Sequence, residues 1–143
     1  MSTEDNKAIV RRLIEEGFNQ RNLAIFDELY APDFVYHLGS TAIQGREPYK
    51  QFTLMSFTSF PDVRFTIEDQ VAEADEVVTR WTWRGTHQGP FQGIPPTGKH
   101  VMVTGVGINH FAANGKIVEN WTNMDILGLL QQLGVVPAPG QTS

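Results

Sequence analysis

The sequence predicts an α+β domain in which helices come first and long strands follow. Apolar residues recur at helical spacing in the first 60 residues and alternate with polar residues in most of the remainder. A strong two-residue turn signal, Asn114-Gly115, joins two of the alternating segments. This order is typical of helices packed on one face of an antiparallel sheet. We expect a curved sheet with a mixed edge, bent around three N-terminal helices into a cone.

Three helices are expected in the first 60 residues. Residues 4–18 place apolar side chains three or four positions apart, behind capping serine and threonine residues. A shorter helix over 23–30 ends before Pro32, because a residue that precedes proline avoids helical geometry. Residues 47–60 form the third helix, which a proline stops.

The remaining segments are expected to be strands, apart from loops and one last helix. A short aromatic and β-branched run at 34–37 is followed by a loop at 39–45. The other expected strands share an alternating pattern and cover 63–71, 76–86, 99–111 and 116–124. A loop rich in glycine and proline spans 89–98, and a short C-terminal helix covers 126–133.

Composition limits the classes of function. The 143 residues suit a single domain over 1–143, with 136–143 as a flexible tail. The formal net charge of -5 and the absence of a basic cluster argue against nucleic acid or an anionic membrane as partner. No cysteine is present, and the four histidines form no close-spaced pair, so no metal site is predicted. The polar N-terminus favours a cytoplasmic protein.

Asp125 is the first candidate for chemistry, because it stands where the last strand meets the last helix. Counting alternate residues back from it places Trp121 on the same face of the strand. If that face is the concave one, partial desolvation would raise the pKa of the carboxyl group and suit it to proton transfer. Alternatively, Asp125 caps the helix that begins at Ile126.

Polar candidates accompany Asp125. His87 follows Trp81 and Trp83 at even spacing, so it is expected at the rim of the same hollow, as a donor to a substrate oxygen or as a structural residue. His37 and Asn109 are further candidates for the cavity wall.

Apolar candidates supply a surface for a flat ligand, or simply a packed core. Besides the three tryptophans they are Tyr36, Phe91 and Met55.

Several spaced motifs resemble the SnoaL-like polyketide cyclases, within the nuclear transport factor 2-like (NTF2-like) cone fold. They are Gly85-Thr86-His87-Gln88-Gly89, the segment 93–99, and Gly115-Lys-Ile-Val-Glu119 with Trp121 and Asp125. The resemblance runs from the first helix to Gly134.

The resemblance implies a cofactor-independent enzyme that closes a ring by intramolecular aldol condensation of a hydrophobic, polyketide-like ester. It implies an acid at the position of Asp125 as general acid and base, and a homodimer formed through the sheet, with a tetramer as a further possibility. Two alternatives stay open at this point: a domain that binds a small molecule without catalysis, and an isomerase or hydrolase on the same fold.

Overall fold

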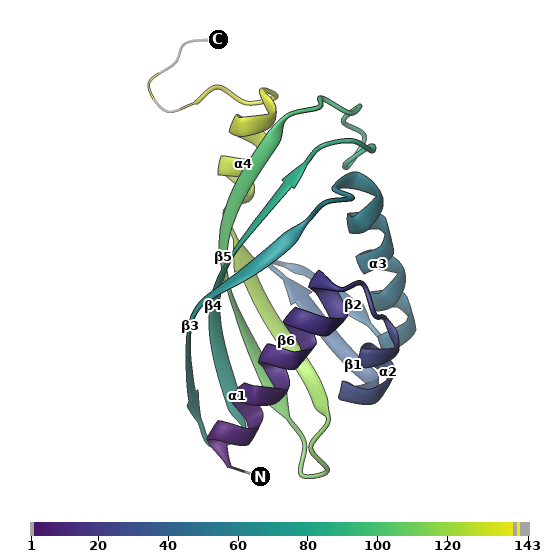
Figure 1. Ribbon diagram of the computed structural model, residues 1–143, viewed down its shortest axis with the longest axis vertical. Coiled ribbons are helices and arrows are strands. Elements are labelled where there is room, and N and C mark those ends of the chain that lie inside the picture. Colours follow the sequence, from purple (N-terminus) through teal and green to yellow (C-terminus); the bar gives the residue numbers. More distant parts are fainter. Residues whose placement is uncertain (1, 139, 141–143) are drawn as a thin grey trace.

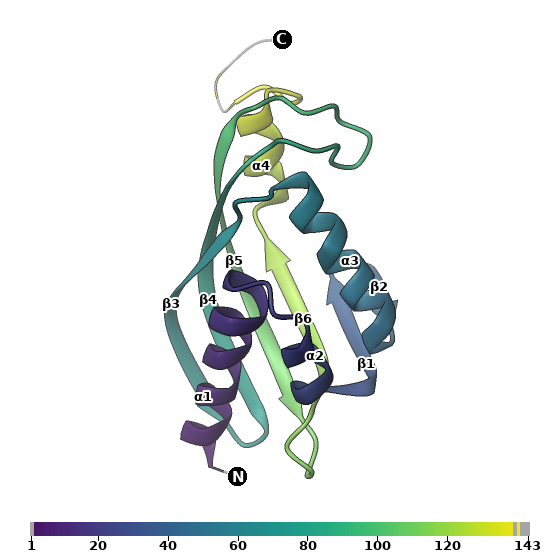
Figure 2. The ribbon, with the colours of Figure 1, turned by 45° about the vertical axis from the view of Figure 1, so that its right-hand side comes forward.

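A computed structural model of the chain describes residues 2–138 and 140. Within this part six strands form one open, curved sheet in the order β2-β1-β6-β5-β4-β3, and the helices lie along its concave face (Figures 1 and 2). Neighbouring strands run antiparallel, except that β1 and β6 are parallel. The strands are β1 (Tyr30–Leu38), β2 (Thr41–Gln44), β3 (Arg64–Glu73), β4 (Glu76–Thr86), β5 (His100–Phe111) and β6 (Ile117–Met124). The predicted α+β class with a curved, mixed sheet is confirmed.

The helices also follow the predicted order. They are α1 (Thr3–Arg12), the π-helical segment η1 (Leu13–Asn19), α2 (Ala24–Leu29), α3 (Arg46–Ser59) and the C-terminal α4 (Ile126–Leu133). The predicted helix over 4–18 is therefore split, since its second half widens to π geometry. Gly17 lies in that half, where an added Cβ would approach the ring of Phe26 to 3.0 Å. The chain thus brings α2 close to the end of the first helix.

Two segments differ from the sequence-based expectation. The expected loop at 39–45 contains β2, which forms a hairpin with β1 and pairs Tyr36 with Ile43. β1 is also longer than the predicted 34–37, and it begins immediately after α2. Of the predicted tail at 136–143, residues 139 and 141–143 lie outside the described residues.

The interior consists of two apolar clusters on the concave side of the sheet. The first lies under α1 to α3 and includes Val10, Phe26, Phe34, Tyr49 and Ile117. The second joins β4 and β5 to α4 and includes Phe60, Trp83, Val101, Val103 and Leu129. Burial of these side chains supplies the main driving force for the fold.

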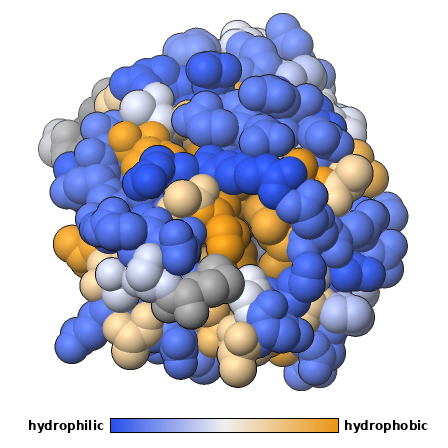
Figure 3. Space-filling view, turned by 60° about the horizontal axis from the view of Figure 1, so that its bottom comes forward, coloured by the Kyte–Doolittle hydropathy of each residue, from blue (hydrophilic) through white to orange (hydrophobic). Residues whose placement is uncertain are grey.

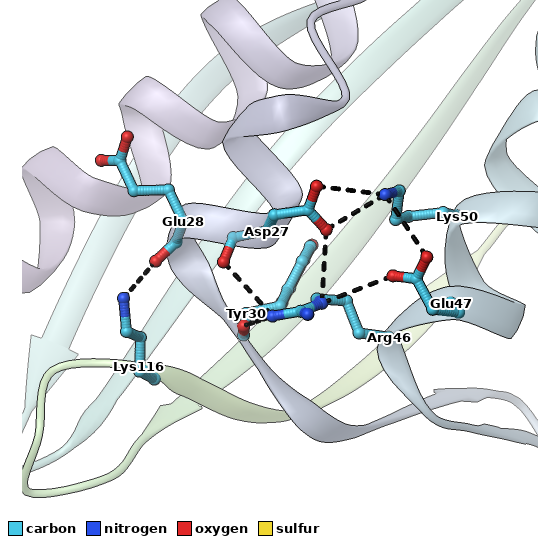
Figure 4. Close-up of polar contacts among 7 residues, drawn as sticks. All are labelled: Asp27, Glu28, Tyr30, Arg46, Glu47, Lys50 and Lys116. Atoms are coloured by element: carbon cyan, nitrogen blue, oxygen red, sulfur yellow. Dashed lines mark hydrogen bonds and ion pairs between the residues drawn. The ribbon is translucent and has the colours of Figure 1, made fainter.

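A polar cluster on the surface ties α2 to α3 (Figure 4). Lys50 donates to the carboxylate of Asp27 over 3.0 Å, and Arg46 lies 3.4 Å from the same carboxylate. Arg46 also donates to the main-chain carbonyl of Tyr30 over 3.2 Å, where β1 begins. Lys116, in the turn just before β6, donates to the main-chain carbonyl of Glu28 in α2. These ion pairs are partly exposed, so they fix orientation more than they add stability.

Trp81 of β4 packs directly over Gly105 of β5. A Cβ on Gly105 would lie 2.4 Å from Cη2 and 2.6 Å from Cζ3 of the indole. Real Cβ atoms do not approach a ring so closely, because the overlap is strongly repulsive. The missing side chain at Gly105 therefore fixes where the six-membered ring of Trp81 can lie.

We predict that Gly105→Ala lowers the free energy of unfolding by about 1–3 kcal/mol, because the indole of Trp81 must shift to admit the methyl group. Urea denaturation followed by far-UV circular dichroism measures the change. Gly107→Ala is the matched control in the same strand: its Cβ would meet no atom closer than 3.4 Å, an ordinary contact. Equal stability of the two variants would contradict this account of the packing.

Candidate functional site

A cavity of about 430 Å³ lies between the concave face of the sheet and the helices. Its wall is rich in aromatic side chains, which are Phe18, Tyr30, Tyr36, Tyr49, Phe52, Phe57, Phe60, Phe65, Trp81, Trp83 and Phe91. A space-filling view onto the lower end of the molecule shows apolar residues within a hollow that mostly polar residues surround (Figure 3). A volume of this size suits a small organic molecule.

The cavity reaches the surface beside α3. Met55 and Thr58 of α3 and Gln92 of the loop between β4 and β5 line the cavity and are also exposed. Met55 has 69% of its surface exposed. The flexible thioether therefore stands at the opening, where it can adapt to a ligand that enters.

A chain of neutral polar side chains crosses the sheet side of the cavity. The hydroxyl of Thr122 donates to Oδ1 of Asn120 over 2.6 Å, and Nδ2 of Asn120 donates to Oδ1 of Asn109 over 2.9 Å. Tyr36 continues the chain through a hydrogen bond with Thr122. These four side chains are buried. Buried polar groups of this kind orient a ligand that is otherwise held by apolar contacts.

The wall carries no ordinary acid or base. Among the described residues that line the cavity there is no aspartate, glutamate, histidine, lysine or arginine. Its ionisable groups are the phenols of Tyr30, Tyr36 and Tyr49, and burial raises the pKa of each. For Tyr36 burial raises the pKa to about 12, although the hydrogen bond with Thr122 partly offsets this. The cavity is therefore electrically neutral at physiological pH.

Several residues predicted for the site do lie in this wall. They are Tyr36, Met55, Trp81, Trp83, Phe91 and Asn109. The tryptophans face inward because they share one side of β4 with Val77 and Thr79, which are also buried. The same alternation in β5 turns Asn109 inward and leaves His110 on the outer face.

The prediction that Trp121 and Asp125 face the cavity is wrong. The pairing of β5 with β6 shifts register between His110 and Phe111, so β6 contains an extra residue after Ile117. Beyond that point the faces are exchanged, and it is Asn120 and Thr122 that point inward.

Asp125 caps α4. Its Oδ1 accepts the backbone N–H of Gly128 over 2.9 Å, and the residue is exposed and absent from the cavity wall. A Cβ at position 128 would lie 2.1 Å from Oδ2 of Asp125, so a side chain there would make the carboxylate shift. Of the two interpretations that the sequence allowed, the structural one therefore describes this carboxylate.

His37 also lies outside the cavity, contrary to prediction. Its Nε2 is 2.6 Å from Oε2 of Glu119, and its ring stacks on Trp121 with centroids 5.5 Å apart. The reason is local: neighbouring residues of a strand face opposite ways, and Tyr36 is the one that points inward. The pair of His37 and Glu119 belongs to the outer face of the sheet.

His87 is fully buried, rather than at the rim of the cavity. Its Nδ1 accepts the backbone N–H of Thr97 over 3.2 Å, which places the proton of the neutral ring on Nε2. The ring packs against Phe60 and Phe91, which do line the cavity. His87 therefore holds the loop between β4 and β5 and reaches the cavity only through its neighbours.

Sequence reasoning missed Asn120 and Thr122. Their only signal is a polar residue on each side of Trp121 in the last strand. Two polar residues flanking a tryptophan predict an inward pair only if the register of the strand is known.

The comparisons with known proteins agree with this architecture. The family model for SnoaL-like polyketide cyclases matches residues 8–133. The chain belongs to the SnoaL-like polyketide cyclase family. The matched segment runs from α1 to the end of α4, so it includes every strand and every helix that forms the cavity.

Solved structures of similar chains come from several bacteria. IdmH of Streptomyces antibioticus, provisionally described as a polyketide cyclase, is 34% identical, with a TM-score of 0.79 over 90% of this chain and 98% of that one. A Jannaschia protein provisionally described as a SnoaL-like polyketide cyclase is 28% identical, with a TM-score of 0.87 over 94% and 95%. AclR of Streptomyces galilaeus, provisionally described as a hydroxylase, is 28% identical, with a TM-score of 0.86 over 98% and 87%.

No curated protein sequence is significantly similar to the chain. In residues 2–138 and 140 no helix is both long and apolar enough to cross a membrane.

We predict that Asp125→Ala lowers the free energy of unfolding by about 1 kcal/mol, because the N–H of Gly128 loses its acceptor. Asp125→Asn, which keeps a capping oxygen, should change stability by only a few tenths of that amount. Urea denaturation of both variants measures the difference. Equal losses in the two would show that the cap does not act through this hydrogen bond.

We also predict a loss of stability at alkaline pH. The unfolded chain releases the Tyr36 proton near pH 10, whereas the folded chain keeps it until its raised pKa of about 12. Between these values the unfolded state binds fewer protons, so the free energy of unfolding falls as pH rises, by roughly 2–3 kcal/mol for this group. Thermal unfolding at several pH values should show a smaller alkaline loss for Tyr36→Phe; an identical loss would contradict the assignment.

Proposed function

We propose that the cavity binds a neutral, largely apolar, polyketide-like molecule and promotes its ring closure by intramolecular aldol reaction. The observation that supports this most directly is an aromatic-rich cavity of about 430 Å³ with a neutral chain of hydrogen-bonded side chains on its sheet side. Confinement of a flexible substrate brings its reacting carbons together, and such positioning alone accelerates reactions greatly.

The chemistry of ring closure fits a wall without cofactor or charge. Aldol addition moves a proton from the attacking carbon to the carbonyl oxygen that becomes a hydroxyl, so the product is an isomer of the substrate. A carbon between two carbonyl groups is acidic enough to lose that proton to water. Asn120 donates one Nδ2 hydrogen to Asn109, so its other Nδ2 hydrogen can donate a hydrogen bond to an oxygen that gains negative charge.

In this proposal Asp125 is not the general base. Its carboxylate is exposed and is bonded to the N–H of Gly128, so it does not meet a substrate in the cavity. The family resemblance implied a general acid and base at this position. In this proposal the substrate's own acidity and the neutral hydrogen-bond donors of the wall take the place of that group.

A second candidate function is binding without catalysis. The observation that favours it is the same absence of acid and base groups among the described lining residues. A carrier or binding protein needs only the apolar wall and a few orienting polar groups.

The outer face of the sheet is where we propose that a second copy of the chain packs. Met102 and Val106 of β5 are exposed on this face, and Ile108 of the same strand pairs with Trp121, whose ring stacks on His37. Exposed apolar side chains grouped on one sheet face are typical of contact surfaces between subunits.

We predict that the protein accelerates ring closure of a synthetic aromatic β-keto ester whose second ketone is placed for six-membered ring formation. The assay is chromatography with mass detection, which separates an open ester from a cyclic product of the same mass. Asn120→Leu should lower the rate about tenfold or more, because it removes a donor and interrupts the polar chain. Asp125→Asn is the matched control outside the cavity and should keep full activity.

Two outcomes would contradict the proposal in different ways. Binding of the ester without acceleration over buffer would favour the carrier function. Loss of activity in Asp125→Asn, with stability unchanged, would restore a catalytic role to that carboxylate.

A further inference from the structure

Three polar atoms converge on the side of Gly107 that faces the cavity. A Cβ placed on Gly107 would lie 3.4 Å from Oγ1 of Thr122, 3.5 Å from Nδ2 of Asn120 and 3.5 Å from Nε1 of Trp81. Gly107 itself lines the cavity. The space that a side chain would fill at this position is thus bounded by hydrogen-bonding groups from two neighbouring strands, β4 and β6. We call it the Gly107 niche.

The indole of Trp81 is held with its N–H toward this niche. The nearest atoms to a Cβ on Gly105 all belong to the six-membered ring of Trp81, whereas the nearest indole atom to Gly107 is Nε1. The ring also packs edge-on against Phe65, with centroids 5.3 Å apart. No group in the described part of the chain accepts the indole N–H. The donor is therefore oriented and available.

Asn120 provides a second donor of fixed direction. Its Oδ1 accepts from Thr122 and its Nδ2 donates one hydrogen to Asn109, which together fix the orientation of the amide. The other hydrogen on Nδ2 has no acceptor among the described residues. An N–H donor of this kind is costly to keep in a largely apolar cavity unless an acceptor meets it.

We propose that the Gly107 niche is a binding site for a ligand carbonyl oxygen, held by the indole N–H of Trp81 and the amide N–H of Asn120. This rests on the proposed function, because it assigns the place of one substrate oxygen within the same cavity. A ligand oxygen is not bonded to Cα of Gly107, so it would lie beyond the Cβ position, on the cavity side, between the two N–H groups that flank that position.

The donors also select the chemical class of the ligand. The niche offers N–H groups and no cation, so a carboxylate there would be buried without a counter-charge. A ketone or ester carbonyl satisfies the donors without that cost. Because the surrounding wall is aromatic, the class that fits is an aryl ketone or aryl ester.

The same donors bear on ring closure. When a ketone forms its enolate, negative charge gathers on the oxygen, and oriented N–H groups stabilise that charge. In the niche, Trp81 and Asn120 therefore hold the oxygen of the ketone that forms the enolate. The carbon next to this ketone is the one that attacks. The proton that this carbon loses is the one that the new hydroxyl gains, so no further reactant is needed.

The test compares 1-tetralone with tetralin, two probes of nearly the same shape that differ by one carbonyl oxygen. Dissociation constants come from titration followed by nitrogen–proton NMR, in which each tryptophan gives a separate indole signal. The Trp81 signal is identified by its loss in Trp81→Phe. With wild-type protein, 1-tetralone should move this signal downfield and tetralin should not, because only the ketone accepts its proton.

Two variants remove the niche in different ways. Gly107→Ala fills it with a methyl group that makes only ordinary contacts, and Trp81→Phe removes the donor while it keeps an aromatic wall. In each, the affinity for 1-tetralone relative to tetralin should fall about three- to tenfold, the size expected for one neutral hydrogen bond. Trp83→Phe is the control, since Trp83 lines the cavity away from the niche and should change both affinities alike.

The outcomes separate the niche from the cavity. If both probes bind and their affinity ratio is unchanged in Gly107→Ala and Trp81→Phe, the niche is not a carbonyl site although the cavity binds ligands. An unmoved Trp81 signal in the tetralone complex overturns the assignment in the same way. If neither probe binds to wild-type protein, the cavity is not a ligand site and the proposed function fails with the niche.

Discussion

The extra residue at the start of β6 decides which side chains meet a ligand. The register shift near Ile117 moves Trp121 to the outer face and turns Asn120 and Thr122 into the cavity. Because side chains alternate along a strand, a shift of one residue exchanges every group beyond it. The polar chain along the sheet, and with it the neutral character of the cavity, depends on this single irregularity in strand pairing.

The fold could be predicted from the sequence in most of its parts because its signals are local. Apolar spacing located α1, α3 and the long strands, and the Asn114-Gly115 turn located the last hairpin. The four-residue β2 was missed, since a strand of that length between polar residues carries no periodic signal. The π geometry of η1 was missed because the spacing of apolar residues alone does not separate it from an α-helix.

Within β4, β5 and β6 the site was predictable only where the strand pairing is regular. Trp81, Trp83 and Asn109 lie in strands that alternate without interruption across the cavity, and simple counting placed them correctly. His37 was misplaced because neighbouring residues of a strand face opposite ways, and Tyr36 is the one that is buried. For Asp125 the sequence allowed a cap or a base, and only the direction of one carboxylate, toward Gly128, separates the two.

The contact between Asp125 and Gly128 has a consequence for the history of the chain. A side chain at 128 would meet the carboxylate in its present orientation, so a substitution there turns the acid away from this cap. We expect the acid to take another orientation in a relative that carries a bulkier residue at the second of these sites. Two positions three residues apart would then record, in an alignment of such relatives, when the carboxylate stopped binding the backbone and became available for chemistry.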